Sequence, residues 1–336
     1  MTDNTIKLGH GSGGTLTREL IEGTLLRFFD SPLLSDLPDS AVLPAATGRI
    51  AFTTDTYVVD PIFFPGGDIG KLAVCGTVND LAVVGATPRC ISCALILEEG
   101  LPQSDLEVVL SSMEDAAEVC QVEVVTGDTK VVPRGKADGI FINTAGIGIV
   151  SPEANQPGAR MEAGDAVLVT GPVGDHGAAV LAQRQGLHLK SEVLSDCAPL
   201  TALARTILEG AERVSFLRDV TRGGLATILN EAAEGSGLGI VLDEETIPVR
   251  PEVRSICELL GIDPLYLACE GRLAAVLDAD SADSLMEALS AVPDGDNCAI
   301  VGRVTEDYPD QLVAQTPFGT HRLIQMLSGE QLPRIC

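Results

Sequence analysis

The sequence predicts a protein of two mixed domains, an α/β domain followed by an α+β domain, with a flexible C-terminal tail. Apolar strand-like runs alternate with helical stretches throughout the chain, which is typical of mixed α and β folds. A break at residues 151–160 contains two prolines, a glycine and no hydrophobic periodicity, as a linker does. With 336 residues, 45% of them hydrophobic, the chain is long and apolar enough for two cores. We place the domains at residues 1–152 and 160–325, and the tail at residues 326–336.

The elements of the first domain follow from its apolar runs. Strands are expected at residues 50–54, 89–97, 122–126 and 139–150, and helices at about residues 70–84 and 104–120. The second domain opens with an apolar run at residues 166–170. Further strands are expected near residues 214–218, 239–242, 272–277 and 298–304, with helices between them.

Composition and charge exclude several classes of function. A net charge of −26 repels the phosphate backbone of nucleic acids, and the chain has no tryptophan on which bases could stack. The N-terminal residues lack the apolar core of a signal peptide, and no apolar run is long enough to span a bilayer. Nine cysteines without a disulfide-like spacing suit reduced thiols, so we expect a cytoplasmic protein that binds neither nucleic acid nor membrane.

A glycine-rich run, Gly9-His-Gly-Ser-Gly-Gly14, precedes a helix expected to begin at Thr15. The run fits the G-x-G-x-x-G pattern, but residues 5–8 are too few to form the buried strand that a dinucleotide fold requires. Two interpretations remain, a flexible N-terminal loop and a backbone flap whose amides close over phosphate groups. The flap would use Gly11, Ser12, Gly13 and Gly14.

Three aspartates suggest a magnesium site. Asp55 follows the first expected strand and Asp128 follows the third, while Asp80 lies in the polar part of an expected helix. Ligands bind at the carboxyl edge of open α/β sheets, and clustered carboxylates there repel one another unless a cation lies between them. Each aspartate taken alone fits a helix cap or a turn equally well.

The lysines support the same site. The chain has only five lysines, and Lys71, Lys130 and Lys136 flank these aspartates. Asp128 and Lys130 could serve one phosphate group, the carboxylate through Mg²⁺ and the ammonium directly. The neighbouring residues Asn79 and Thr129 are included among the expected nucleotide ligands.

Two motifs of the second domain contribute further polar groups to the expected site. Arg218-Asp-Val-Thr-Arg-Gly-Gly-Leu225 leads into a helix expected near Leu225, whose N-terminal amides could bind an anion, and Asp219 is an expected nucleotide ligand. Glu270 lies among apolar neighbours in Leu267-Ala-Cys-Glu-Gly-Arg272. Burial would raise its pKa and suit it to proton transfer, although a structural pair with Arg272 is the alternative.

The sequence ends in a cysteine, Cys336, within the run Pro333-Arg-Ile-Cys336. At about 3.3–3.6 Å per residue, the ten residues after Met326 could sweep roughly 30 Å. Such an arm could carry a sulfur atom between a catalytic pocket and a second protein, and a frayed end with an idle thiol is the alternative.

Taken in order, these motifs resemble the PurM-like superfamily of ATP-using enzymes, which includes aminoimidazole ribonucleotide synthetase, selenophosphate synthetase and thiamine monophosphate kinase. The runs at residues 127–132, 218–225 and 333–336 are similar to those of the HypE family of hydrogenase maturation factors. The resemblance covers nearly the whole chain. It implies a two-domain PurM-like fold that binds ATP in the first domain, forms a homodimer through that domain's sheets, and helps to make cyanide for nickel-iron hydrogenases.

The resemblance also implies a reaction. The partner HypF would load a carbamoyl group onto the Cys336 sulfur, and ATP would dehydrate it to a thiocyanate whose cyanide passes to iron on HypC–HypD. Asp55, Asp80 and Asp128 would hold Mg²⁺ on the phosphates, Lys130 would offset negative charge, and Glu270 would remove the amide protons. Two other classes stay open: a small-molecule kinase or synthetase of the superfamily, and a non-catalytic scaffold.

Overall fold

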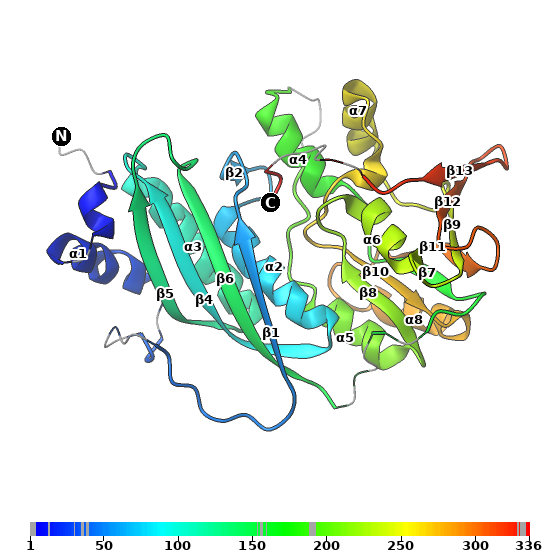
Figure 1. The fold of residues 1–336 in the computed structure, drawn as a ribbon, viewed down its shortest axis with the longest axis horizontal. Coiled ribbons are helices and arrows are strands. Elements are labelled where there is room, and N and C mark those ends of the chain that lie inside the picture. Colours follow the sequence, from blue (N-terminus) through cyan, green and yellow to red (C-terminus); the bar gives the residue numbers. More distant parts are fainter. Residues whose placement is uncertain are drawn as a thin grey trace.

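The structure is a computed structural model that describes residues 5–12, 14–29, 31–34, 37, 40–152, 154, 157–158, 160–187, 193–327, 329 and 334–336. Two lobes lie side by side, each built on its own sheet, and the chain passes from the first to the second after Val150 (Figure 1). Both lobes combine helices with strands, which confirms the expected mixed two-domain class. No helix in the described part of the chain is long and apolar enough to cross a membrane.

The first lobe is a four-stranded sheet in the order β1-β6-β4-β5, in which only β4 and β5 run parallel. Its strands are β1 (Ile50–Tyr57), β4 (Ala86–Glu98), β5 (Glu123–Val132) and β6 (Ile140–Val150), with a small hairpin of β2 (Phe63–Phe64) and β3 (Gly67–Asp68). Its helices are α1 (Thr15–Gly23), α2 (Ile69–Val83) and α3 (Gln103–Cys120), with short 3₁₀ turns η1 (Leu8–Gly11) and η2 (Leu25–Arg27).

Helix α2 lies at the centre of the molecule. The Asp68 carboxylate caps its first turn by accepting hydrogen bonds from the Gly70 and Lys71 amides at 2.7 and 3.1 Å. Almost every α2 side chain is buried, because the helix packs on the sheet of its own lobe and also against α5 and β8 of the second lobe. The polar residues of α2 therefore lie where the two lobes meet.

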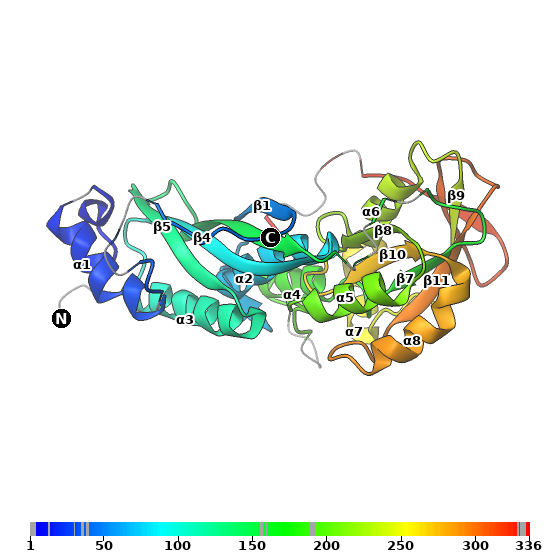
Figure 2. The ribbon, with the colours of Figure 1, turned by 90° about the horizontal axis from the view of Figure 1, so that it is seen from below.

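Helices α2 and α3 lie on one side of the first sheet (Figure 2). In the part of the chain that the structure describes, no helix lies over the other side. Apolar side chains remain there, with Ile50, Phe52 and Ile96 exposed by 62%, 69% and 42%. Exposed apolar side chains on an uncovered sheet face are typical of an interaction surface. We call it the open face.

The second lobe is a seven-stranded sheet in the order β13-β12-β9-β11-β7-β10-β8, antiparallel apart from the pair β9 and β12. Its strands are β7 (Ala166–Val169), β8 (Val214–Asp219), β9 (Gly239–Asp243), β10 (Leu273–Leu277), β11 (Ala299–Thr305), β12 (Leu312–Gln315) and β13 (His321–Ile324). Its helices are α4 (Asp175–Arg184), α5 (Thr201–Gly210), α6 (Gly224–Ala233), α7 (Pro251–Leu260) and α8 (Ala282–Ser290), with 3₁₀ turns η3 (Pro264–Tyr266) and η4 (Ala279–Ser281).

Two strand ends differ from the expectation. Asp55 and Asp128 lie inside β1 and β5 rather than after them, because each is paired across the sheet, Asp55 with Thr144 and Asp128 with Ala94. The apolar runs stop where polar residues begin, whereas backbone pairing with neighbouring strands continues. The expectation that both aspartates follow strand ends was therefore wrong.

Candidate active site

The end of the chain is docked between the two lobes, near β2 and α4 (Figure 1). The Val58 amide donates to the backbone oxygen of Cys336 at 3.2 Å, and the Asp60 amide donates to the Arg334 carbonyl oxygen at 3.3 Å. The Ile335 side chain, exposed by 4%, joins a hydrophobic cluster that contains residues of both lobes. Residues 334–336 are thus held by backbone pairing and by apolar burial.

The Arg334 side chain adds charge to this docking. It forms ion pairs with Asp138 at 2.5 Å and with Asp60 at 3.8 Å, both in the first lobe. Its Nε also donates to the Val58 carbonyl oxygen at 3.3 Å. These partly exposed contacts orient the tail, and each contributes at most about 1 kcal/mol.

The docked Cys336 thiol lies close enough to the Glu270 carboxyl group for that group to raise the thiol pKa. Glu270 is 4% exposed, and within the part of the chain that the structure describes its Oε1 atom has no hydrogen-bond partner. Burial, followed by the charges of Asp219 and Asp196, raises the Glu270 pKa well above its ordinary value, while Arg222 opposes the shift. A raised pKa makes the carboxylate a stronger base once it is ionised.

The alternative of a structural pair between Glu270 and Arg272 is not what the structure contains. Arg272 instead approaches Asp196 at 3.7 Å and Asp175 at 3.9 Å. Asp196 in turn accepts a hydrogen bond from the Glu270 backbone amide at 3.0 Å. The network therefore fixes the Glu270 backbone and leaves its carboxyl group turned toward Cys336.

The docked thiol is a poor nucleophile. Burial and the neighbouring Glu270 raise the Cys336 pKa well above its ordinary value, and Arg222 opposes the shift. A hollow of about 340 Å³ adjoins Cys336 and is lined in part by Arg222, Thr227 and Tyr266. The site thus keeps the sulfur protonated while leaving room beside it for a small group.

Three further carboxylates from separate elements gather near Glu270. Asp80 of α2 accepts a hydrogen bond from the Thr53 hydroxyl at 2.7 Å, and burial together with the charge of Asp55 raises its pKa. Asp219, the last residue of β8, has its pKa raised to about 7 by burial and by Asp80 and Asp55. The charge of each of these carboxylates thus acts on the pKa of its neighbours. We call Asp55, Asp80, Asp219 and Glu270, with Cys336, the tail half-site.

Asp128 does not belong to this group. Across the first sheet the residues opposite Asp55 are Thr144, then Cys93, then Gly127, so Asp55 and the region of Asp128 lie on opposite edge strands. At about 4.8 Å per strand the separation is roughly 14 Å. Successive side chains alternate between faces, so Asp128 points to the open face and Asp55 to the other face.

The three aspartates predicted to hold one magnesium ion therefore do not meet within one chain. Among the described residues, no group of three or more His, Cys, Asp or Glu side chains is placed to hold a metal ion. Asp55 and Asp128 do lie on the first sheet, but the sequence could not reveal that β6 and β4 lie between β1 and β5.

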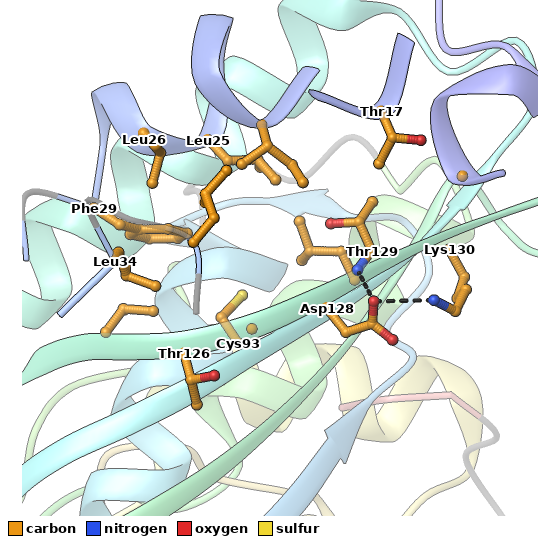
Figure 3. A pocket seen from close by; sticks show the side chains of 16 residues that line it. Thr17, Leu25, Leu26, Phe29, Leu34, Cys93, Thr126, Asp128, Thr129 and Lys130 are labelled. Atoms are coloured by element: carbon orange, nitrogen blue, oxygen red, sulfur yellow. Dashed lines mark hydrogen bonds and ion pairs between the residues drawn. The ribbon is translucent and has the colours of Figure 1, made fainter. Parts of the chain in front are cut away.

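A second polar group, Asp128, Thr129 and Lys130 of β5, lines a pocket of about 330 Å³ between β5 and the N-terminal helices (Figure 3). We call these three residues the β5 half-site. The Lys130 ammonium lies 3.0 Å from Asp128 Oδ1, and the Thr129 amide donates to the same oxygen at 2.8 Å. Leu25 and Phe29 form an apolar wall above these groups. The pocket thus combines an apolar wall with a charged rim.

The glycine-rich run packs against the same strand. A side chain at Gly11 would place its Cβ 2.3 Å from the Val131 amide nitrogen, so only glycine fits there. The Ser12 hydroxyl donates to the Leu8 carbonyl oxygen at 3.0 Å, and Gly14, with φ of +77°, precedes α1. Helix α1 begins at Thr15 as predicted, and Gly13 lies outside the described residues.

Two predicted nucleotide ligands have other roles in this structure. Asn79 is 1% exposed; its amide group donates to the Ala198 carbonyl oxygen at 3.1 Å and accepts from the Leu200 amide at 2.8 Å. Asn79 therefore joins the two lobes, and its role as a nucleotide ligand stays a prediction. The Lys71 ammonium donates to the Gly66 carbonyl oxygen at 3.4 Å, away from the β5 half-site.

Comparison with known proteins decides the family. The descriptions "AIR synthase related protein, N-terminal domain" and "AIR synthase related protein, C-terminal domain" match residues 38–150 and 162–314. The chain is 46% identical to Carbamoyl dehydratase HypE of Rhodobacter capsulatus, over 100% of this chain and 99% of that one. This chain belongs to the HypE family.

Solved structures of the HypE family agree with this assignment. A HypE crystallised in complex with ATP is 48% identical and superimposes with a TM-score of 0.93, covering 99% of this chain and 100% of that one. A HypE from a HypE–HypF complex is 42% identical with a TM-score of 0.79, covering 92% and 99%. The resemblance in the sequence motifs is thereby confirmed.

Sequence reasoning missed several residues of this HypE-family site. His176 and Arg184 of α4 contact the docked tail, and Arg222 lies beside Cys336. His176 is an isolated histidine in the run Gly174-Asp-His-Gly177, without any spacing typical of a motif. Its partner lies 159 residues away, so only the fold reveals the contact.

Proposed function

We propose that this chain is an ATP-dependent dehydratase that converts an S-carbamoyl group on its own Cys336 into a thiocyanate during nickel-iron hydrogenase maturation. The observation that supports it best is the docking of Cys336 beside the buried Glu270. A frayed terminal thiol would not pair its backbone with a strand end or bury Ile335. The relatives named carbamoyl dehydratase support the same function.

The reaction fits the groups present. A carbamoyl group on the sulfur loses its oxygen, which leaves as phosphate after it accepts the γ-phosphoryl group of ATP, and both amide protons leave to form a carbon–nitrogen triple bond. Glu270, turned toward Cys336, would accept an amide proton. Lys130 would offset charge on the phosphoryl group. Arg222, next to the same hollow, would face the negative charge that develops.

A second copy of the chain would complete the site. The tail half-site and the β5 half-site lie at opposite edges of one sheet, and the apolar open face between them is free to pack on a partner. Two copies packed through their open faces and related by a two-fold axis bring β5 of one chain toward β1 of the other. We therefore propose a homodimer in which Asp128 and Lys130 act on the tail half-site of the partner.

Magnesium is the cation that fits the tail half-site. Its donors are carboxylate oxygens, and Mg²⁺ in ATP sites is held by one or two carboxylates together with phosphate oxygens and water. Asp55 and Asp80, whose charges already repel each other, would be its protein ligands, and Asp219 lies near both. Bound Mg²⁺ would neutralise charge on the phosphates. Lys130 and Asp128 of the partner would align the same phosphates.

The wider setting follows from the family. HypF would supply the carbamoyl group, in keeping with a relative solved as a HypE–HypF complex. Cyanide would pass to iron on HypC–HypD, and the compartment would be the cytoplasm. Because the docked thiol is protonated, loading by HypF would require the tail to leave the site.

The mass of the C-terminal peptide tests the proposal. After carbamoylation of Cys336, addition of Mg-ATP should remove the mass of one water from that peptide alone, and Cys336→Ala should show no such change. A carbamoyl group that persists in folded, ATP-binding protein would instead favour a small-molecule kinase or synthetase. No binding of Mg-ATP at all would favour a scaffold.

A further inference from the structure

We propose that His176 and Arg184 of α4 form a clamp that holds the tail by its main chain and holds it equally whatever group the Cys336 sulfur carries. These are positioning residues: they set where the sulfur lies relative to Glu270 and do not touch the reacting atoms. The inference deepens the proposed function, since the group carried is taken to be carbamoyl.

His176 is completely buried and makes two directed hydrogen bonds. Its Nε2 lies 2.8 Å from the Ile335 carbonyl oxygen, and its Nδ1 lies 2.9 Å from the Ser195 hydroxyl. A carbonyl oxygen only accepts, so the proton lies on Nε2. The Ser195 oxygen accepts from the Cys197 amide at 3.1 Å and its hydroxyl donates to Nδ1, which fixes this neutral tautomer.

The surroundings keep the imidazole in place. The Phe64 ring meets it edge-on with centroids 5.2 Å apart, and burial lowers the His176 pKa. A neutral ring with a single directed donor is therefore aimed at one backbone atom of the tail.

Arg184, the last residue of α4, holds the carbonyl group of Arg334, which precedes Ile335 in the tail. Its Nη2 donates to the Arg334 carbonyl oxygen at 2.7 Å, and its Nε donates to the Asp60 carbonyl oxygen at 2.8 Å. The Asp60 amide donates to the same Arg334 oxygen. One guanidinium thus joins the tail, the second lobe and the segment that follows β1.

Neither clamp residue contacts the Cys336 side chain through any of these hydrogen bonds. The contacts end on the carbonyl groups of residues 334 and 335, which are the same in the free thiol, the thiocarbamate and the thiocyanate. The clamp therefore contributes equally to the docking of each form. Differences in docking among the three forms must come from the groups around the sulfur, chiefly Glu270 and Arg222.

Two backbone amides report docking directly. The Val58 and Asp60 amides donate to the tail, so their hydrogen exchange rises in proportion to the undocked fraction. Exchange would be measured in the whole protein without ATP, once with Cys336 as the free thiol and once after carbamoylation by cyanate, confirmed by peptide mass.

The variants form matched pairs. His176→Asn keeps an acceptor for Ser195 but cannot reach Ile335, whereas His176→Gln places an amide donor near the position of Nε2. We expect His176→Asn and Arg184→Gln to speed exchange of the two amides by roughly tenfold, the effect of one lost hydrogen bond of this kind. His176→Gln should stay near the wild type, as should His321→Gln on the surface.

The central expectation is that each variant has the same fold effect on the free and the carbamoylated tail, with exchange in β10 unchanged. Unchanged exchange in His176→Asn and Arg184→Gln would overturn the clamp. A change in exchange confined to the carbamoylated form would contradict the claim that the clamp holds both forms equally. It would show instead that these residues interact with the carbamoyl group. If the wild type fails to lose water with Mg-ATP, the proposed function fails, whereas these exchange rates still decide the clamp.

Discussion

Truncating Ile335 isolates the apolar part of tail docking. Its side chain is exposed by only 4% and packs in a hydrophobic cluster shared by the two lobes, so Ile335→Ala removes three buried carbon atoms from the docked state. At about 0.8 kcal/mol for each buried CH₂ group, docking should weaken by roughly 2.4 kcal/mol. With tenfold for every 1.4 kcal/mol, the undocked fraction should rise about 50-fold.

The assay is the rate at which iodoacetamide alkylates Cys336, followed on the C-terminal peptide at a fixed pH. Because the reagent attacks the undocked tail, the rate reports the undocked fraction. Leu323→Ala, which truncates a half-exposed side chain on β13, is the matched control and should leave the rate unchanged. Thermal stability should change little in either variant. An Ile335→Ala rate within twofold of the wild type would refute the view that Ile335 anchors the tail.

Three further outcomes are expected. Glu270→Gln should leave the fold and ATP binding intact and abolish water loss from the loaded peptide; unaltered turnover would remove Glu270 from the mechanism. The docked Cys336 pKa is raised, so its contribution to docking is complete below about pH 9, the value of a free thiol, and is lost as pH rises toward the docked value. Exchange of the Val58 amide, divided by its intrinsic base-catalysed rate, should therefore rise over that range, and a constant ratio would contradict the assignment. Asp55→Asn and Lys130→Ala chains, each inactive, should regain part of the dehydration activity when mixed and allowed to exchange subunits, whereas no recovery would show that both residues serve the same copy of the site.

The class of fold and the burial of Glu270 could be predicted from the sequence. Helix α1 begins at the predicted Thr15, and Glu270 is buried with a raised pKa as its apolar neighbours suggested. These features depend on local pattern and composition, which a single sequence records directly.

Features that depend on strand order, or on contacts between residues far apart in the chain, could not be predicted from the sequence. Asp55 and Asp128 look equivalent along the chain, yet β6 and β4 separate them, because the fold inserts those strands between β1 and β5. Asn79 looks like a polar ligand beside Asp80, yet it bonds to a segment about 120 residues away. His176 has no motif at all, and its role depends on where residue 335 docks.

The most direct test of the reaction uses a carbamoyl group whose oxygen is labelled with ¹⁸O. The label would be placed on Cys336 by HypF from labelled carbamoyl phosphate, and Mg-ATP would then be added. If the carbamoyl oxygen accepts the γ-phosphoryl group, the label appears in inorganic phosphate while the peptide loses one labelled water equivalent. Label recovered in bulk water, with unlabelled phosphate, would contradict dehydration through phosphorylation at Cys336.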